Sequence, residues 1–165
     1  MKTKTTITAS LFAALCMGAF GIFSTASADH HESSTGGTTH TVDAQGVKFN
    51  PMFLYVEPGD TVTWSNMIGH NVETIDIMVP EGQEKVLTEM GQLPAITFDQ
   101  TGIVVYKCTP HWGARMGGII VVGKPDDPSA IIDAYTAAIE SDPSSKPAKG
   151  LLKKLRVDME SKGLL

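Results

Sequence analysis

The chain has 165 residues and a formal net charge of −5, and this length suits one domain together with a short processed segment. An acidic balance argues against nucleic acid as a partner, because proteins that bind nucleic acid usually present a basic face. Its two cysteines, Cys16 and Cys108, are too few for a small secreted fold held together by disulfides.

The first 28 residues have the pattern of a secretion signal. Lys2 and Lys4 precede an apolar run over residues 7–23, and an Ala-x-Ala cleavage motif ends at Ala28. We expect cleavage of residues 1–28 and export to the periplasm. The mature chain then has a net charge of −7, because the leader carries two lysines and no acidic residue. A retained membrane anchor is the alternative, but the apolar run is short and is interrupted by two glycines.

Residues 29–39 form a polar tail that we expect to be flexible, because it has no apolar side chain to bury. After cleavage the chain would begin with Asp29-His30-His31. A free amine with histidine in third position can bind Cu(II) in a square-planar set. A second copper site in this tail is therefore a hypothesis, and histidines without a role are the alternative.

From His40 the sequence changes to short β-rich segments that are separated by turn residues. The clearest signals are the turn at Pro58-Gly59-Asp60 and the alternation over residues 61–64. Residues 82–91 look irregular, which is typical of a surface loop. Many short strands in a stretch of this size predict a Greek-key β-sandwich over residues 40–123. The expected strands are 40–42, 47–49, 53–56, 61–64, 71–75, 96–98, 103–106 and 118–122.

Residues 124–165 predict two C-terminal helices. Asp127 followed by Pro128 is typical of a helix start, and the second helix begins at about residue 147. The second helix has one apolar and one basic face, and such a helix can lie on a membrane surface. Packing of both helices on the sandwich, without stable membrane insertion, is the simpler interpretation. The apolar positions are Ile131, Tyr135 and Ile139 in the first helix and Leu151, Leu155 and Met159 in the second.

Cys108, His111 and Met116 place a thiol, an imidazole and a thioether within nine residues. Without the leader, Cys108 is the only cysteine, so a metal bond would explain a thiol that has no disulfide partner. Soft sulfur ligands combined with an imidazole suit a copper ion that alternates between Cu(I) and Cu(II). Zinc also accepts cysteine and histidine but gains little from methionine. The pattern therefore predicts one copper ion, with a second histidine still to be supplied.

The second imidazole can come from His70 or from His40. His70 stands in Gly69-His70-Asn71 between two predicted strands, so it belongs to a turn at one end of the sandwich. The segment that holds Cys108 also connects two strands, and a Greek key can bring two such turns to the same end. His40 opens a strand and has no turn residues around it, so His70 is the preferred candidate.

Four stretches of the sequence resemble the cupredoxins, and among them the pseudoazurins. They are Val56-Glu-Pro-Gly-Asp-Thr-Val-Thr-Trp64, Gly69-His70-Asn71-Val72-Glu73, Val79-Pro-Glu-Gly82, and the segment from Tyr106-Lys-Cys-Thr-Pro-His111 to Met116. Two C-terminal helices are also a pseudoazurin feature, whereas plastocyanins end after the last strand. The resemblance covers the chain from about residue 40 to its end. It implies one copper ion held by His70, Cys108 and His111, with Met116 as the weak axial ligand.

Pseudoazurins carry single electrons in the periplasm, often to nitrite reductases and related terminal enzymes. The resemblance therefore implies a monomeric carrier rather than an enzyme, since protein ligands would occupy every copper position. Its redox partner would be a nitrite reductase, a cytochrome c or a dehydrogenase, docking where the edge of His111 reaches the surface inside an apolar patch. The residues expected in this patch are Met67, Ile68, Pro110, Trp112, Gly113 and Ala114, and packing of Trp112 and Met67 in the core is the alternative.

The sequence departs from the pseudoazurin pattern at Ile68, because these proteins usually have a lysine before the Gly-His pair. Lys107 and Arg115 remain near the site, but the mature chain is acidic overall. We therefore expect weak electrostatic steering toward an acidic partner and a more hydrophobic docking face. As in the family, the backbone N–H of Asn71 is expected to donate to the sulfur of Cys108.

A periplasmic copper storage or delivery protein is the alternative function, and the histidines of the tail favour it. A delivery protein would release Cu(I) to a competitor, whereas a carrier would hold copper tightly and change its oxidation state reversibly. A copper or zinc enzyme is a third possibility, but the pattern offers neither a general base nor a vacant ligand position.

Overall fold

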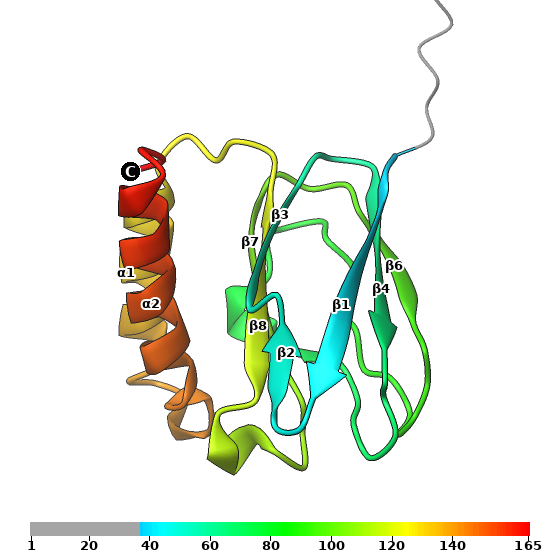
Figure 1. Cartoon of the computed structure of the whole chain (residues 1–165). Coiled ribbons are helices and arrows are strands. Elements are labelled where there is room, and N and C mark those ends of the chain that lie inside the picture. The colour runs from blue at the N-terminus through cyan, green and yellow to red at the C-terminus, as the bar shows by residue number, and fades with distance from the viewer. Residues whose placement is uncertain (1–36) are drawn as a thin grey trace, which may run out of the picture. The chain divides into compact units, whose positions relative to one another are not determined.

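The computed structural model describes residues 37–165, so the expected leader and most of the polar tail lie outside the described residues. Two four-stranded sheets face each other in this part of the chain, which confirms the predicted β-sandwich (Figure 1). The first sheet has the order β2-β1-β4-β6, from Lys48–Asn50, Thr39–Gln45, Asp60–Ser65 and Ala95–Phe98. The second has the order β3-β8-β7-β5, from Phe53–Val56, Gly117–Val122, Gly102–Lys107 and Glu73–Thr74.

Each of the eight predicted strands is present, and β5 is shorter than predicted, because it has two residues where the prediction covers 71–75. Side-chain bonding explains the difference. The N–H of Val72 donates to the hydroxyl of Thr88 at 2.9 Å, so it does not enter a strand ladder. The short strand leaves the preceding turn free to take an irregular path.

The first strand, β1, begins at Thr39, a residue predicted to belong to the polar tail. Asp60 holds this start in place. Its carboxylate accepts the N–H of Thr38 at 2.7 Å and lies 2.8 Å from Nε2 of His40. Thr38 and Thr39, which the polar composition assigns to the tail, thus belong to the sandwich.

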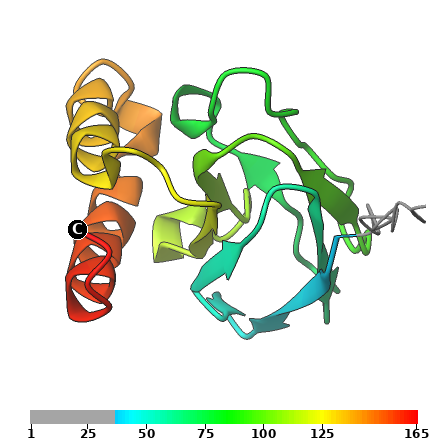
Figure 2. The same cartoon turned by 90° about the horizontal axis from the view of Figure 1, so that it is seen from above.

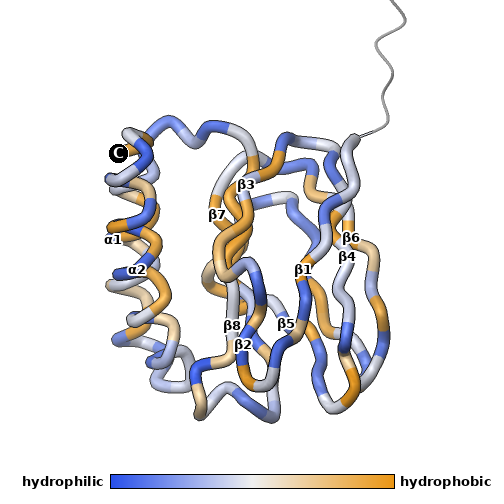
Figure 3. The backbone as a smooth tube through the Cα atoms, viewed as in Figure 1, coloured by the Kyte–Doolittle hydropathy of each residue, from blue (hydrophilic) through white to orange (hydrophobic). Residues whose placement is uncertain are grey.

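Two helices, α1 (Pro128–Ala138) and α2 (Ala148–Ser161), cover the outer face of the second sheet as a third layer (Figures 1 and 2). The central strands β7 and β8 are therefore buried on both faces, which explains their continuous apolar sequences, coloured orange in Figure 3. Alternate residues serve two separate cores. Val104, Tyr106, Ile120 and Val122 pack between the sheets, and Ile103, Val105, Ile119 and Val121 pack against the helices.

The C-terminal helices form where the sequence predicts them. The side chain of Asp127 accepts the N–H of Ala130 at 2.8 Å, and Pro128 occupies the first helical position. The apolar face of α2 is buried against the second sheet, as is Ile132 of α1, whereas the neighbouring Ile131 is only partly buried. Within residues 37–165, neither helix has the length and apolarity needed to cross a membrane.

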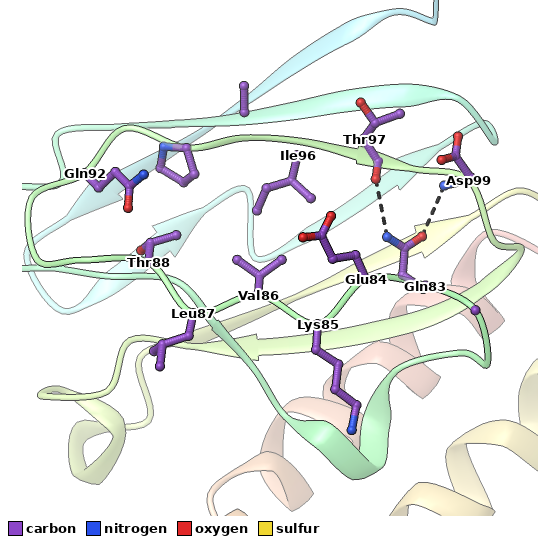
Figure 4. A pocket seen from close by; sticks show the side chains of 13 residues that line it. Gln83, Glu84, Lys85, Val86, Leu87, Thr88, Gln92, Ile96, Thr97 and Asp99 are labelled. Carbon is purple, nitrogen blue, oxygen red and sulfur yellow. Dashed lines mark hydrogen bonds between the residues drawn. The ribbon is translucent and has the colours of Figure 1, made fainter.

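Residues 82–88 cover the open edge of β6 (Figure 4). The side-chain amide of Gln83 takes the place of a neighbouring strand, because it donates to the carbonyl of Thr97 at 3.3 Å and accepts the N–H of Asp99 at 3.1 Å. Leu87 forms an isolated bridge with Glu73, so the same segment also extends the second sheet beyond β5. A cavity of about 580 Å³ lies between this segment and β6, and none of the predicted copper ligands lines it.

We expect the helical layer to contribute strongly to stability. Leu152 of α2 is fully buried, and Leu152→Ala should lower the free energy of unfolding by about 2–5 kcal/mol, because the lost methyl groups leave a cavity. Val157→Ala is the control, since Val157 is 59% exposed on the same helix and its truncation should cost less than about 0.5 kcal/mol. Urea denaturation followed by circular dichroism measures both values, and equal effects would contradict this packing.

Candidate metal centre

The segment from Cys108 to Met116 connects β7 to β8 and folds into a compact loop. The N–H of Cys108 donates to the carbonyl of Met116 at 2.9 Å, which closes the loop at its base. The N–H of His111 donates back to the carbonyl of Cys108 at 3.2 Å, and a short 3-10 helix, η2 (Trp112–Ala114), follows. These bonds bring the Nδ1 atom of His111 to 3.4 Å from the sulfur of Cys108.

His70 lies in the turn between β4 and β5, at the same end of the sandwich as the Cys108 loop (Figure 1). Gly69 has a φ of 78°, a conformation that suits glycine and lets the chain reverse. The N–H of His70 donates to the carbonyl of Met67, and its carbonyl accepts the N–H of Gly91, both at 2.9 Å. The backbone of His70 is thus held on two sides, and its Nδ1 atom lies 3.6 Å from the sulfur of Cys108.

The donor atoms of His70, Cys108 and His111 all lie within 4.8 Å of one another. Metal–nitrogen and metal–sulfur bonds of about 2.0 and 2.3 Å, meeting at a trigonal angle, require the two donors to be about 3.7 Å apart. The observed sulfur–nitrogen distances of 3.4 and 3.6 Å fit this requirement closely. The residues present therefore suit a small metal ion bound by one thiolate and two imidazoles.

The protonation of His70 also suits a ligand. Burial lowers the pKa of His70, and the neighbouring His111 lowers it further. A metal needs a neutral imidazole, so a lowered pKa keeps the nitrogen lone pair available. Cys108 is fully buried and is the only free cysteine among residues 37–165.

Met116 lies beside Cys108 through the backbone hydrogen bond that closes the loop. Its side chain is fully buried in the same apolar cluster as Cys108. A thioether in such surroundings has no polar competitor and can act as a weak, soft ligand. His40, the alternative source of an imidazole, is bound to Asp60 at the start of β1 and takes no part in this cluster.

A pair of polar side chains joins the two turns, and the sequence did not predict it. Asn71 donates from Nδ2 to the hydroxyl of Thr109 at 2.9 Å and accepts the N–H of Thr109 at Oδ1 at 2.8 Å. The hydroxyl of Thr109 also donates to Glu73, which pairs with Lys107 at 3.3 Å. The hydrogen bonds found among residues 37–165 include none from the N–H of Asn71 to the sulfur of Cys108, and the contacts of Asn71 with the loop are made by its side chain.

The apolar patch predicted around His111 is smaller in the structure. Met67 and Trp112 are buried, because the first packs in the core between the sheets and the second packs against the helices. His111 itself is partly buried and Ile68 is 93% exposed. The exposed members that remain are Ile68, Pro110, Gly113 and Ala114.

The pairing of Asn71 with Thr109 should stabilise the centre before any metal binds. We expect Asn71→Ala to lower the free energy of unfolding of the metal-free protein by about 1–3 kcal/mol, because it removes both hydrogen bonds to Thr109, each worth about 0.5–1.5 kcal/mol. A double-mutant cycle with Thr109→Ala should give a coupling energy of about 0.5–3 kcal/mol. Urea denaturation measures the four free energies, and strictly additive effects would show that the two residues act independently.

Comparison with known families places the chain among copper proteins. Residues 37–123 match the family of copper binding proteins described as plastocyanin/azurin. The pseudoazurin of Methylorubrum extorquens is 39% identical over 80 residues, which cover 48% of this chain and 54% of the relative. The pseudoazurin of Paracoccus pantotrophus is 37% identical over 90 residues, which cover 54% of this chain and 61% of the relative. The chain thus spans only 54% and 61% of the length of these curated relatives.

Solved structures agree with this assignment. The refined crystal structure of pseudoazurin from Methylobacterium extorquens AM1 has a TM-score of 0.58 at 29% identity, over 71% of this chain and 98% of that one. Native pseudoazurin from Hyphomicrobium denitrificans has a TM-score of 0.52 at 30% identity, over 59% of this chain and 82% of that one. The matched family segment contains His70, Cys108, His111 and Met116. The chain therefore belongs to the plastocyanin/azurin family of copper-binding proteins.

Proposed function

We propose that this chain is a one-electron carrier in which His70, Cys108, His111 and Met116 hold a single type 1 copper ion. The observation that carries the proposal is the convergence of one buried thiol and two imidazoles, from two separate turns, within 4.8 Å. Membership of a copper-binding family supports the choice of ion. The similarity to two pseudoazurins supports the choice of function.

Bound copper would take up and release one electron as it changes between Cu(I) and Cu(II). The chain keeps the donor atoms in place while the charge of the site changes, because the loop bonds and the Asn71–Thr109 pair hold both turns. His70 is only 8% exposed, whereas His111 is more accessible. The imidazole of His111 is therefore the part of the site closest to a docked partner, and we assign the electron route to its outer edge.

A carrier fits the site better than an enzyme or a copper store. Four protein ligands would leave no coordination position for a substrate. Copper storage or delivery is the second candidate, since the histidines of the tail could pass the ion on, but those residues lie outside the described part of the chain. The burial of Cys108 and His70 favours retention of copper, because a competing ligand cannot reach these two donors directly.

We place the carrier in the periplasm, since the first 28 residues have the pattern of a secretion signal and the mature chain would keep a single thiol. A nitrite reductase, a cytochrome c or a dehydrogenase would be its partner, and it would act as a monomer. Docking would use the exposed residues around His111, which form a small apolar surface suited to a brief encounter.

The charges next to this surface largely cancel. The amine of Lys107 lies 3.3 Å from the carboxylate of Glu73, and both side chains are mostly buried. Arg115 is exposed and adds one positive charge to the rim. Ile68, at the position where pseudoazurins usually have lysine, adds none. Docking should therefore depend on apolar contact more than on long-range attraction.

Copper titration tests the proposed site directly. The wild-type chain should bind one Cu(II) tightly and acquire an intense visible band from sulfur-to-copper charge transfer. Cys108→Ser should abolish this band, because serine offers no thiolate, whereas Met116→Leu should retain it, because the thioether is the weak ligand. Absorption spectroscopy gives the result, and a band of normal intensity in the Cys108→Ser protein would contradict the ligand assignment.

Voltammetry separates a carrier from a store. We expect a reversible one-electron wave from the copper-loaded protein, and a Cu(I) form that keeps its metal in the presence of a competing chelator, because two donors are buried. Rapid transfer of Cu(I) to the chelator, without a reversible wave, would favour storage or delivery.

The docking face can be tested by restoring the missing lysine. With an acidic redox partner, Ile68→Lys should raise the association rate several-fold at low salt and make it fall more steeply as salt is added. Val157→Lys adds the same charge on the outer face of α2, where Val157 is 59% exposed, and should change the rate little. Stopped-flow kinetics at several salt concentrations measure this, and equal effects of the two lysines would argue against docking near Ile68.

A further inference from the structure

Trp112 belongs to the Cys108 loop, but its side chain is bonded to the helical layer. It follows His111 directly, yet it is only 8% exposed, whereas Gly113, Ala114 and Arg115 are exposed. Its indole N–H donates to the carbonyl of Ser144 at 2.8 Å. Ser144 is 32 positions after Trp112 in the sequence, so the bond joins the Cys108 loop to the connection between α1 and α2.

The acceptor of this bond is itself well fixed. Ser144 lies in a short 3-10 helix, η3 (Pro143–Ser145), which stands beside the Cys108 loop in Figure 1. The carboxylate of Asp142 accepts the N–H of Ser144 at 3.1 Å and its hydroxyl at 2.6 Å, and it also accepts the buried hydroxyl of Ser145. The carbonyl of Ser144 is therefore held by a hydrogen-bonded 3-10 turn that precedes α2.

The indole ring is also confined by packing. A Cβ atom added at Gly117 would lie 2.9 Å from Cζ3 of Trp112, 2.9 Å from Cδ1 of Leu151 and 2.8 Å from the carbonyl oxygen of Tyr106. The first residue of β8, the ring and a side chain of α2 therefore meet with no spare room. The ring cannot swing away without moving either β8 or α2.

We propose that Trp112 is a positioning residue for the copper site, an inference that rests on the proposed function. The bonds at the base of the loop hold Cys108 and Met116, and the Asn71–Thr109 pair holds the side nearest His70. The indole holds the remaining side, next to His111, by tying it to the α1–α2 connection. The C-terminal helices thus serve the metal centre as well as the fold, since they keep the imidazole of His111 near the Cys108 sulfur.

Trp112→Phe tests the inference, because phenylalanine keeps a ring in the packed site and removes the N–H donor. Tyr135→Phe is the matched control: its hydroxyl donates to the carbonyl of Ile103 at 3.0 Å, so it also ties the helices to the sheet by one aromatic donor, away from the loop. Both variants should lose similar thermal stability. Only Trp112→Phe should shift the sulfur-to-copper band and speed the loss of copper to a chelator by about three- to tenfold.

Two further measurements keep the result clear. In the metal-free protein, backbone hydrogen exchange over residues 108–116 should be faster in Trp112→Phe and unchanged in Tyr135→Phe. Leu151→Ala, which removes the helix side of the same contact without changing the loop sequence, should shift the band in the same direction.

An unchanged band and unchanged exchange in a folded Trp112→Phe protein, or equal changes in both phenylalanine variants, would overturn the positioning role while the proposed carrier stands. A wild-type protein without the band would overturn the carrier and this inference together.

Discussion

The antiparallel pairing of β7 with β8 is the constraint on which the metal centre depends. Their ladder runs from Gly102 opposite Val122 to Lys107 opposite Gly117, and the bond from Cys108 to Met116 adds one more step. Both strands are buried between two apolar layers, so a slip by one residue would turn each side chain toward the wrong core. The register that satisfies both cores also decides which residues open and close the ligand loop.

The glycines that begin β8 allow this pair to pack tightly. A Cβ atom at Gly118 would lie 2.3 Å from the hydroxyl oxygen of Tyr106, so only glycine lets that ring cross the strand. Tyr106 in turn contacts Trp64 edge-on, with ring centroids 5.4 Å apart, and Phe49, with centroids 5.1 Å apart. Large aromatic rings therefore fill the core that Cys108 and Met116 share.

Local patterns made most of the fold predictable from the sequence. Apolar runs, turn residues and the Asp127-Pro128 helix start act over a few neighbouring positions, so the eight strands and both helices could be located in advance. The grouping of His70 with the Cys108 loop was also foreseeable, because both segments join strands. The bond of Trp112 to the α1–α2 connection was not, since it depends on where residue 144 lies after folding. The same holds for Asn71, whose partner is 38 positions away.

Because β8 is buried on both of its faces, truncating the chain after this strand, or pausing its synthesis there, would expose apolar surface. Its outer face, with Ile119 and Val121, has no cover until α1 and α2 have been synthesised. A chain that ended at the last strand would present that face to water, beside Ile103 and Val105 of β7. Such a fragment would tend to associate with other copies through this surface rather than behave as a smaller cupredoxin, so the final third of the domain acts as a built-in protection against aggregation.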